Sequence, residues 1–194
     1  MSKQTKKKVI AAFEDLAGRY GYDQISVQMI IAKAGIGKTT FYRHFKDKAD
    51  VMEARFSMMY DEAILASGCK SVEDLCRTIL LNAREHPEQK VFFESSGYHS
   101  YSEFIYRYTY EIGKKIIERS WGRELTEIEE MGVAFFCAGN SKLFEEFCNG
   151  KRFNNITPDE AANKIISMMS QNYRIVFPEK DDTFLKENLI NGTD

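Results

Sequence analysis

A glycine stands between two short helical patterns inside the segment from Ser26 to Lys48, and it limits the folds open to this chain. Before that glycine, apolar residues recur at helical spacing, which predicts a helix near Ser26 with the serine hydroxyl as its N-cap. Gly35 then stands where the helix must end and the chain reverse, a place that favours a residue free to adopt positive φ. A second helix is predicted from Gly37 to Phe45, so the segment has the pattern of a helix-turn-helix unit.

The second predicted helix has a polar outer surface. Phe41 and Phe45 fall on its inner side, four residues apart. The outer residues are Lys38, Thr39, Tyr42 and His44, with Thr40 at the margin. A cation, hydroxyls and an aromatic ring suit phosphates, base edges and thymine methyl groups, so the pattern predicts a helix that contacts DNA.

A competing interpretation rests on the residues from Ala32 to Thr39, AKAGIGKT, which satisfy a loosened form of the phosphate-loop pattern. The strict form needs a glycine in place of Ala32, a buried strand before the loop, and a later apolar strand that ends in a magnesium-binding Asp. VQMII could form the first strand, but no later segment has the second pattern, and VFFE at 91–94 comes nearest. A nucleotide-binding enzyme through Gly37, Lys38 and Thr39 therefore stays as the less favoured alternative.

Helical periodicity continues on both sides of this segment. An apolar stripe from Val9 to Tyr20, closed by Gly21, predicts an amphipathic helix before it, and Asp47 can cap a long helix of about residues 47–66 after it. Further helices are predicted at 72–83, 101–121, 127–149 and 158–177, with a short piece at 91–93. We therefore expect an all-α fold in which a three-helix head is joined by a long fourth helix to a larger helical body.

The motif AGIGKTTFYRHFKDKADV resembles the N-terminal signature of the TetR family of bacterial transcription regulators, and the resemblance covers about residues 5–55. It implies DNA-backbone contacts from Ser26 and Gln28 and a phosphate contact from Lys48. It also implies a groove-facing side made of Gly37, Lys38, Thr39, Thr40, Tyr42 and His44. Gly37 replaces the Ser or Thr usual in the family, and Thr39 stands where a very small residue is common, so the operator cannot be copied from a relative.

Charge is distributed unevenly along the chain. Residues 1–52 carry ten Lys and Arg against five Asp and Glu, a net charge of +5, and the remainder carries 17 against 24, a net charge of −7. A basic head on an acidic body is typical of a protein that presents one end to phosphates. The lysines near the N-terminus either reach a neighbouring groove or form a solvated tail; they are Lys3, Lys6, Lys7 and Lys8.

The last two long helices have more apolar surface than one buried side needs. The helix over 127–149 has two stripes, one with Ile128, Met131, Phe135, Gly139 and Leu143, the other with Val133, Phe136, Asn140, Phe144 and Phe147. The final helix offers Ile165, Ile166, Met169, Tyr173 and Phe177. We expect a two-fold homodimer through these helices, with reading helices about 34 Å apart on a palindromic operator.

Aromatic residues crowd the sequence between Phe92 and Trp121. Most would be core, but tyrosine and histidine carry polar tips that suit a small-molecule cavity. The family resemblance implies an effector pocket in this body, and we expect an apolar or aromatic molecule there. The candidate contacts are His99, Tyr101, Tyr108, Trp121 and Asn140.

Other chemistry is not indicated. The four cysteines lack CxxC spacing and the three histidines lack metal-ligand spacing, so we expect reduced, mostly buried thiols, no metal site and no cofactor. No nucleophile–base–orienter group, signal peptide or bilayer-spanning run is recognisable, which favours a cytoplasmic protein that is not an enzyme.

Together these patterns predict a helix-turn-helix DNA-binding domain over residues 1–47, an effector-binding and dimerisation domain over 48–178, and a polar tail over 179–194. The predicted function is a ligand-responsive regulator, with a repressor favoured, which binds double-stranded DNA as a homodimer and is released by its effector. The alternative is an architectural or cell-division factor that uses the same head without effector control.

Overall fold

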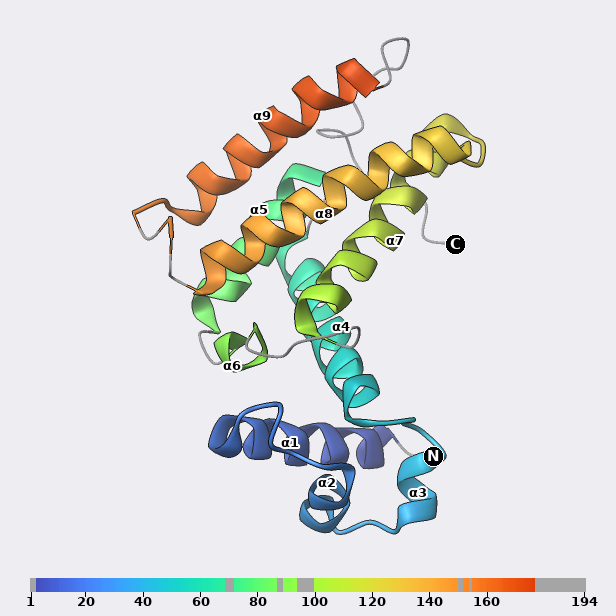
Figure 1. Cartoon of the computed structure of the whole chain (residues 1–194), viewed down its shortest axis with the longest axis vertical. Coiled ribbons are helices and arrows are strands. Elements are labelled where there is room, and N and C mark those ends of the chain that lie inside the picture. Colours follow the sequence, from blue (N-terminus) through green and yellow to red (C-terminus); the bar gives the residue numbers. More distant parts are fainter. Residues whose placement is uncertain are drawn as a thin grey trace. The chain divides into compact units, whose positions relative to one another are not determined.

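The computed structural model describes residues 3–68, 72–86, 89–93, 100–149, 152–153 and 155–176. Every regular element within these residues is a helix, which confirms the predicted all-α fold (Figure 1). In chain order they are α1 (Lys3–Tyr20), α2 (Val27–Ala34), α3 (Lys38–Tyr42), α4 (Lys48–Ser67), α5 (Val72–Glu85), α6 (Lys90–Phe93), α7 (Tyr101–Trp121), α8 (Glu127–Asn149) and α9 (Pro158–Val176). None of these described helices is both long and apolar enough to cross a bilayer.

Packing divides the chain into two compact units. The head unit consists of Met1–Asp61 and Glu88–Phe104, and the body unit consists of Glu62–Pro87 and Ile105–Asp194. The head unit is therefore assembled from two separate stretches of the chain, and α4 runs from one unit into the other. These packing units differ in extent from the predicted functional domains, whose boundary at residue 47 stays a prediction. The predicted tail at 179–194 lies outside the described residues.

The core of the head unit is made by the apolar faces of α1 to α4. Its buried side chains include Val9, Phe13, Leu16, Ala17, Ile30, Phe41, Phe45, Val51 and Met52. Because α2 and α3 are only eight and five residues long, they would be marginal in isolation and depend on this burial.

Aromatic side chains extend this core to α6 and the start of α7. Ring centroids lie 5.6 Å apart for Phe13 and Phe92, 5.0 Å for Phe56 and Phe92, and 4.2 Å for Phe56 and Tyr101. The hydroxyl of the buried Tyr101 donates to Gln89 Oε1 at 3.0 Å, so its polar tip has a partner inside an apolar cluster. Residues about 80 positions apart in the sequence thus share one core.

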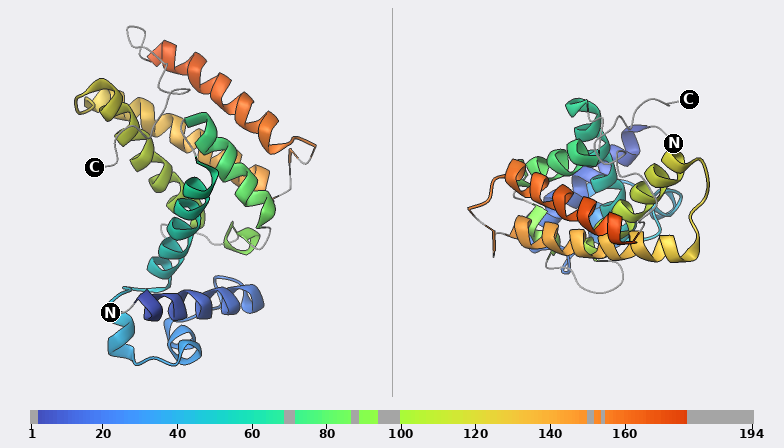
Figure 2. Two further views of the ribbon diagram at one scale, coloured as in Figure 1. Left: turned by 180° about the vertical axis from the view of Figure 1, so that it is seen from behind. Right: turned by 90° about the horizontal axis from the view of Figure 1, so that it is seen from above.

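In the body unit, α9 runs alongside α5, and α8 contacts both of these helices (Figures 1 and 2). Arg77 on α5 joins the two helices through Nε, which lies 2.6 Å from Asp159 Oδ1. The central cluster of buried side chains consists of Ile117, Leu125, Val133, Cys137 and Ile166. It combines residues of α7, α8 and α9 with the turn before α8.

Two helix starts in the body unit carry side-chain caps, and the cap before α9 is reciprocal. Ahead of α9, Thr157 Oγ1 accepts from the N–H of Glu160 at 3.2 Å, and the carboxylate of Glu160 accepts from the N–H of Thr157 at 2.9 Å. Ahead of α8, the carboxylate of Glu129 accepts from the N–H and the hydroxyl of Thr126, both at 2.9 Å. These caps explain why α8 and α9 begin where the sequence pattern predicts.

The prediction that α8 is apolar on two sides is confirmed. Val133, Phe144 and Phe147 are buried, whereas Ile128, Met131 and Phe135 are 64 %, 62 % and 72 % exposed. On α9 the outcome is different, because Ile166 is buried in the core of its own unit and Met169 packs against the same cluster. The side chains of Tyr173 and Phe177 lie outside the described residues.

Candidate DNA-binding surface

Gly35 forms the predicted bend between α2 and α3. Its φ of 63° and ψ of 39° are left-handed, and the N–H of Ile36 donates to the carbonyl of Ile31 at 3.3 Å, which ends α2. The residues VQMII belong to the helix α2 and not to a strand. The phosphate-loop alternative is therefore wrong, because that loop requires a strand leading into the glycine.

The starts of α2 and α3 differ in their capping. Ser26 has extended backbone angles and its Oγ accepts from the N–H of Met29 at 3.3 Å, so the predicted N-cap is confirmed. Gly37 has similar angles, with φ −78° and ψ 154°, but makes no side-chain cap. A Cβ at Gly37 would meet only Thr40 Oγ1, at 3.9 Å. The structure therefore has room for the serine or threonine side chain that this position lacks.

The outer face of α3 carries exposed side chains, which we call the α3 surface: Lys38, Thr39 and Tyr42. Phe41 is fully buried beneath it, and the ring of Tyr42 remains 51 % exposed. The ammonium of Lys38 lies 6.0 Å from the centroid of that ring. Thr40 is half-buried at the margin, as the helical spacing indicates. The outward orientation is confirmed, and contact with DNA stays a prediction.

His44 is placed differently from the α3 surface. The residue is half-buried, and its Nε2 atom is enclosed with no hydrogen-bond partner among the described residues. Burial lowers the pKa of His44 below its usual value, and the charges of Lys6 and Arg43 act in the same direction. The imidazole is therefore neutral at pH 7, and it packs partly inward where the sequence predicts a groove-facing side chain.

Lys48, at the first position of α4, also makes contacts that the sequence does not predict. Its ammonium donates to the carbonyl oxygens of Tyr22, Asp23 and Ile25 at 2.9, 3.2 and 3.1 Å. It also lies 4.5 Å from the centroid of the Tyr22 ring. An ammonium has three N–H donors, so these bonds use all of them. The geometry is that of a side chain that fastens the α1–α2 connection to α4, and it leaves no donor for the predicted phosphate contact.

Ion pairs neutralise part of the positive charge of the head unit. Asp15 lies 2.8 Å from Arg19 and 2.9 Å from Lys33, and the adjacent ammonium of Lys33, followed by the guanidinium of Arg19, holds the pKa of its carboxyl below the usual range. On and just after α3, the cations with no ion pair among the described residues are Lys38, Arg43 and Lys46. Arg43 and Lys46 were not predicted to contact DNA, although both lie within the quoted motif. Their exposure adds them to the candidates. Gln28 is exposed on α2.

The predicted effector residues do not form one site. Tyr101 and Trp121 are the two ends of α7, twenty residues apart, which is about 30 Å along a helix. One small molecule cannot contact both. Tyr101 is fully buried, Tyr108 and Asn140 are half-buried, and His99 lies outside the described residues. The aromatic-rich sequence therefore marks mainly core.

Comparisons with known proteins agree with this geometry. Residues 9–54 match the model of a family described as bacterial regulatory proteins, tetR family. One similar solved structure is a dihydroxyacetone kinase operon activator, DhaS, with a TM-score of 0.53 and 19 % identity over 90 % of this chain and 98 % of that chain. Another is a putative TetR-family transcriptional regulator from Syntrophomonas wolfei, with a TM-score of 0.51 and 15 % identity over 91 % of this chain and 96 % of that chain. A sequence search found no match among curated proteins.

Proposed function

We propose that this chain, whose residues 9–54 match the TetR family model, is a homodimeric, effector-responsive transcription regulator. The family is one of regulators and not of enzymes, in line with the predicted lack of catalysis. The observation that carries the proposal is the α3 surface, a set of exposed polar side chains held on a buried phenylalanine directly after a left-handed glycine turn. DNA as the target implies action in the cytoplasm.

Selection from random duplexes by the full chain, followed by fluorescence anisotropy, tests DNA recognition. We expect a palindromic consensus with half-sites one helical turn apart. Tyr42→Ala should weaken binding to the selected duplex about tenfold or more, the range for one base-reading side chain. Tyr20→Ala is the matched control, because Tyr20 is 54 % exposed but ends α1. Equal loss in both variants, or no consensus, would contradict the assignment.

The homodimer is supported by the exposed side of α8. Ile128, Met131 and Phe135 occupy one stripe, and monomeric proteins rarely leave three such neighbouring side chains more than half exposed. A two-fold axis near residue 133 would bring Met131 of each copy opposite the partner's Phe135, so the stripe is self-complementary.

Sedimentation velocity at micromolar concentration tests this interface. We expect the parent chain to sediment as a dimer and Phe135→Asp as a monomer, because a carboxylate would be desolvated at the centre of the stripe. Leu65→Asp is the control, since Leu65 is 83 % exposed elsewhere in the body unit. A monomeric parent, or dimers of Phe135→Asp, would contradict the interface.

Effector control would act through the difference in effector affinity between two states of the dimer, one of which matches the operator spacing. α4 is the covalent path for this signal, because it is continuous from the head unit into the body unit. We favour a repressor released by its effector. The similar solved structure named as an operon activator makes activation of transcription the competing hypothesis. Transcription from a reporter that carries the selected duplex decides between repression and activation.

An architectural or cell-division factor with the same head would bind DNA without any small-molecule response. The cavity described below favours the regulator over this alternative.

A further inference from the structure

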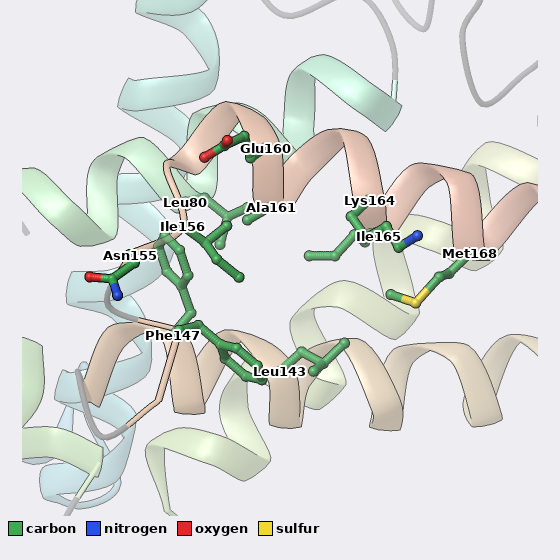
Figure 3. A pocket seen from close by; sticks show the side chains of 11 residues that line it. Leu80, Leu143, Phe147, Asn155, Ile156, Glu160, Ala161, Lys164, Ile165 and Met168 are labelled. Carbon is green, nitrogen blue, oxygen red and sulfur yellow. The ribbon is translucent and has the colours of Figure 1, made fainter.

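The body unit contains an apolar cavity whose lining includes none of the described residues predicted to bind an effector. Its volume is about 460 Å³, within the range of small-molecule sites. Side chains of α8 and α9 stand on opposite sides of it, and residues of α5 and of the α8–α9 connection complete it (Figure 3). Its apolar lining comes mainly from Leu80, Leu143, Phe147, Ala161, Ile165 and Met168.

One end of the cavity is fixed by Arg84 on α5. Its guanidinium donates to the carbonyl of Ile156 at 2.6 Å and lies 4.5 Å from the ring centroid of Phe147. The α8–α9 connection is thereby held against α5. The cavity is therefore preformed, so a ligand would not have to order this end of it.

Most of the lining is hydrocarbon, which offers water few hydrogen bonds. Leu143 and Phe147 of α8 face Ile165 and Met168 of α9 across the space (Figure 3). Replacing poorly bonded water in such a space by an apolar group is favourable. At roughly 30 Å³ for each water-sized group, the volume admits about fifteen non-hydrogen atoms.

Two charged residues stand on α9 at the rim, and only one is available to a ligand. The carboxylate of Glu160 is engaged by the N–H and hydroxyl of Thr157, at 2.9 and 2.8 Å, and these bonds lower its pKa. Lys164, one turn later, makes no ion pair or side-chain hydrogen bond within the described part of the chain. Its ammonium is the polar group that an incoming anion would meet.

The backbone beside the cavity is strained. Phe153 has a φ of 61°, the left-handed region that costs a bulky residue about 1–2 kcal/mol. Among the described residues it is the one non-glycine with positive φ, and it lines the cavity. Backbone strain of this kind is often found where a ligand binds.

We propose that this cavity binds an amphipathic anion, with an unbranched or aromatic apolar body of about fifteen non-hydrogen atoms and one carboxylate-type group paired with Lys164. The ligand would lie between α8, which carries the proposed dimer stripe, and α9. Its regulatory effect rests on the proposed function, whereas binding itself does not. Occupancy would stabilise the helix spacing seen here, and would thereby favour one of the two states of the dimer over the other.

Calorimetry with dodecanoate, at concentrations below micelle formation, tests the site without DNA. We expect saturable binding of one dodecanoate per chain, and at least tenfold weaker binding of dodecyltrimethylammonium, which has the same tail and the opposite charge. Lys164→Gln should lower the affinity for dodecanoate about threefold, the change expected when one exposed ion pair is lost. The control Lys115→Gln, which removes another exposed lysine, should leave the affinity unchanged. Ala161→Phe should weaken binding at least tenfold by filling the cavity, with Leu143→Trp as a second filled variant if Ala161→Phe does not fold.

Four outcomes would overturn the proposal: no saturable binding, equal affinity for the two amphiphiles, full affinity in the filled variants, or binding that appears only in monomeric Phe135→Asp. The last would show that a second copy of the chain fills the cavity. Anisotropy with the selected duplex then separates the two hypotheses. DNA binding without dodecanoate binding removes this site and keeps the regulator, whereas dodecanoate binding without DNA binding keeps the site and removes the regulator.

Discussion

Replacing Lys48 by methionine separates two roles that its position allows. The variant keeps the apolar stem and deletes the ammonium, which bonds three carbonyl oxygens and stacks on Tyr22. A hydrogen bond from a charged donor contributes about 1.5–3 kcal/mol when it is not exposed, and two of the three bonds are partly buried. Partial rehydration of the freed carbonyls offsets some of the loss. We therefore expect Lys48→Met to lower the free energy of unfolding by about 2–4 kcal/mol.

The assay combines urea unfolding with the salt dependence of binding to a non-specific duplex. Each phosphate contact adds about 0.9 to the slope of log K against log salt. Because the donors of Lys48 are used within the chain, Lys48→Met should leave this slope unchanged when measured on the folded protein. Lys38→Met is the matched control: its exposed ammonium makes no ion pair among the described residues, so stability should change by less than about 0.5 kcal/mol while the slope falls by about 0.9.

The reverse result for Lys48→Met would refute this reasoning. An unchanged unfolding midpoint with a slope reduced by about 0.9 would mean that the ammonium contacts a phosphate and that its bonds to the carbonyls contribute nothing. A loss in both measurements would show that the two roles coexist.

Three further predictions concern backbone, protonation and thiol chemistry. Gly35→Ser should lower the free energy of unfolding by about 1–2 kcal/mol, because φ at this residue is 63°. Gly37→Ser should raise it by a few tenths of a kcal/mol, because the serine hydroxyl can act as an N-cap. Thermal unfolding of the two variants measures both changes. Hydrogen bonds from Arg123, and secondarily from the backbone N–H of Thr126, lower the pKa of Glu129 to about 2, so its contribution is present above the unfolded-state pKa near 4.3 and is lost as pH falls towards 2. Glu129→Gln should therefore lower the free energy of unfolding, measured by urea denaturation, by roughly 1 kcal/mol at pH 7 and by little at pH 2.5. An equal loss at the two pH values would contradict this. Burial raises the pKa of the Cys137 thiol to about 11, so it should resist a disulfide reagent at pH 8 until the protein unfolds, and rapid labelling of the native chain at this residue, by mass spectrometry, would contradict its burial.

Local features of this fold were predictable from the sequence. The bounds of α7 and α8, the Ser26 cap and the Gly35 bend follow from spacing and capping chemistry, which depend only on neighbouring residues. The two-sided character of α8 was also predictable, because its two stripes coexist in one helical pattern. The start of α1 was not predictable in the same way. It begins at Lys3, six residues before the apolar stripe, because polar residues can extend a helix without any periodic signal.

The contacts that the sequence did not indicate share a physical cause. Nothing near Lys48 in the sequence shows that carbonyl groups 23 to 26 residues earlier converge on its ammonium. Likewise, aromatic residues that lie close together in the sequence need not lie close together in space. Tyr101 and Trp121 stand at opposite ends of the same helix, α7. The cavity draws its lining from three helices and a connection, so no single segment carries its signature.

The discontinuous make-up of the head unit has a consequence for biosynthesis. Phe92, Tyr101 and Phe104 supply rings to a core shared with Phe13 and Phe56, so a nascent chain that ends at residue 68 would expose aromatic faces of Phe13 and Phe56 to water. The DNA-binding end would consequently mature only after about half of the polypeptide has left the ribosome. A fragment that contains only the first four helices should therefore be less stable than the same helices in the full chain.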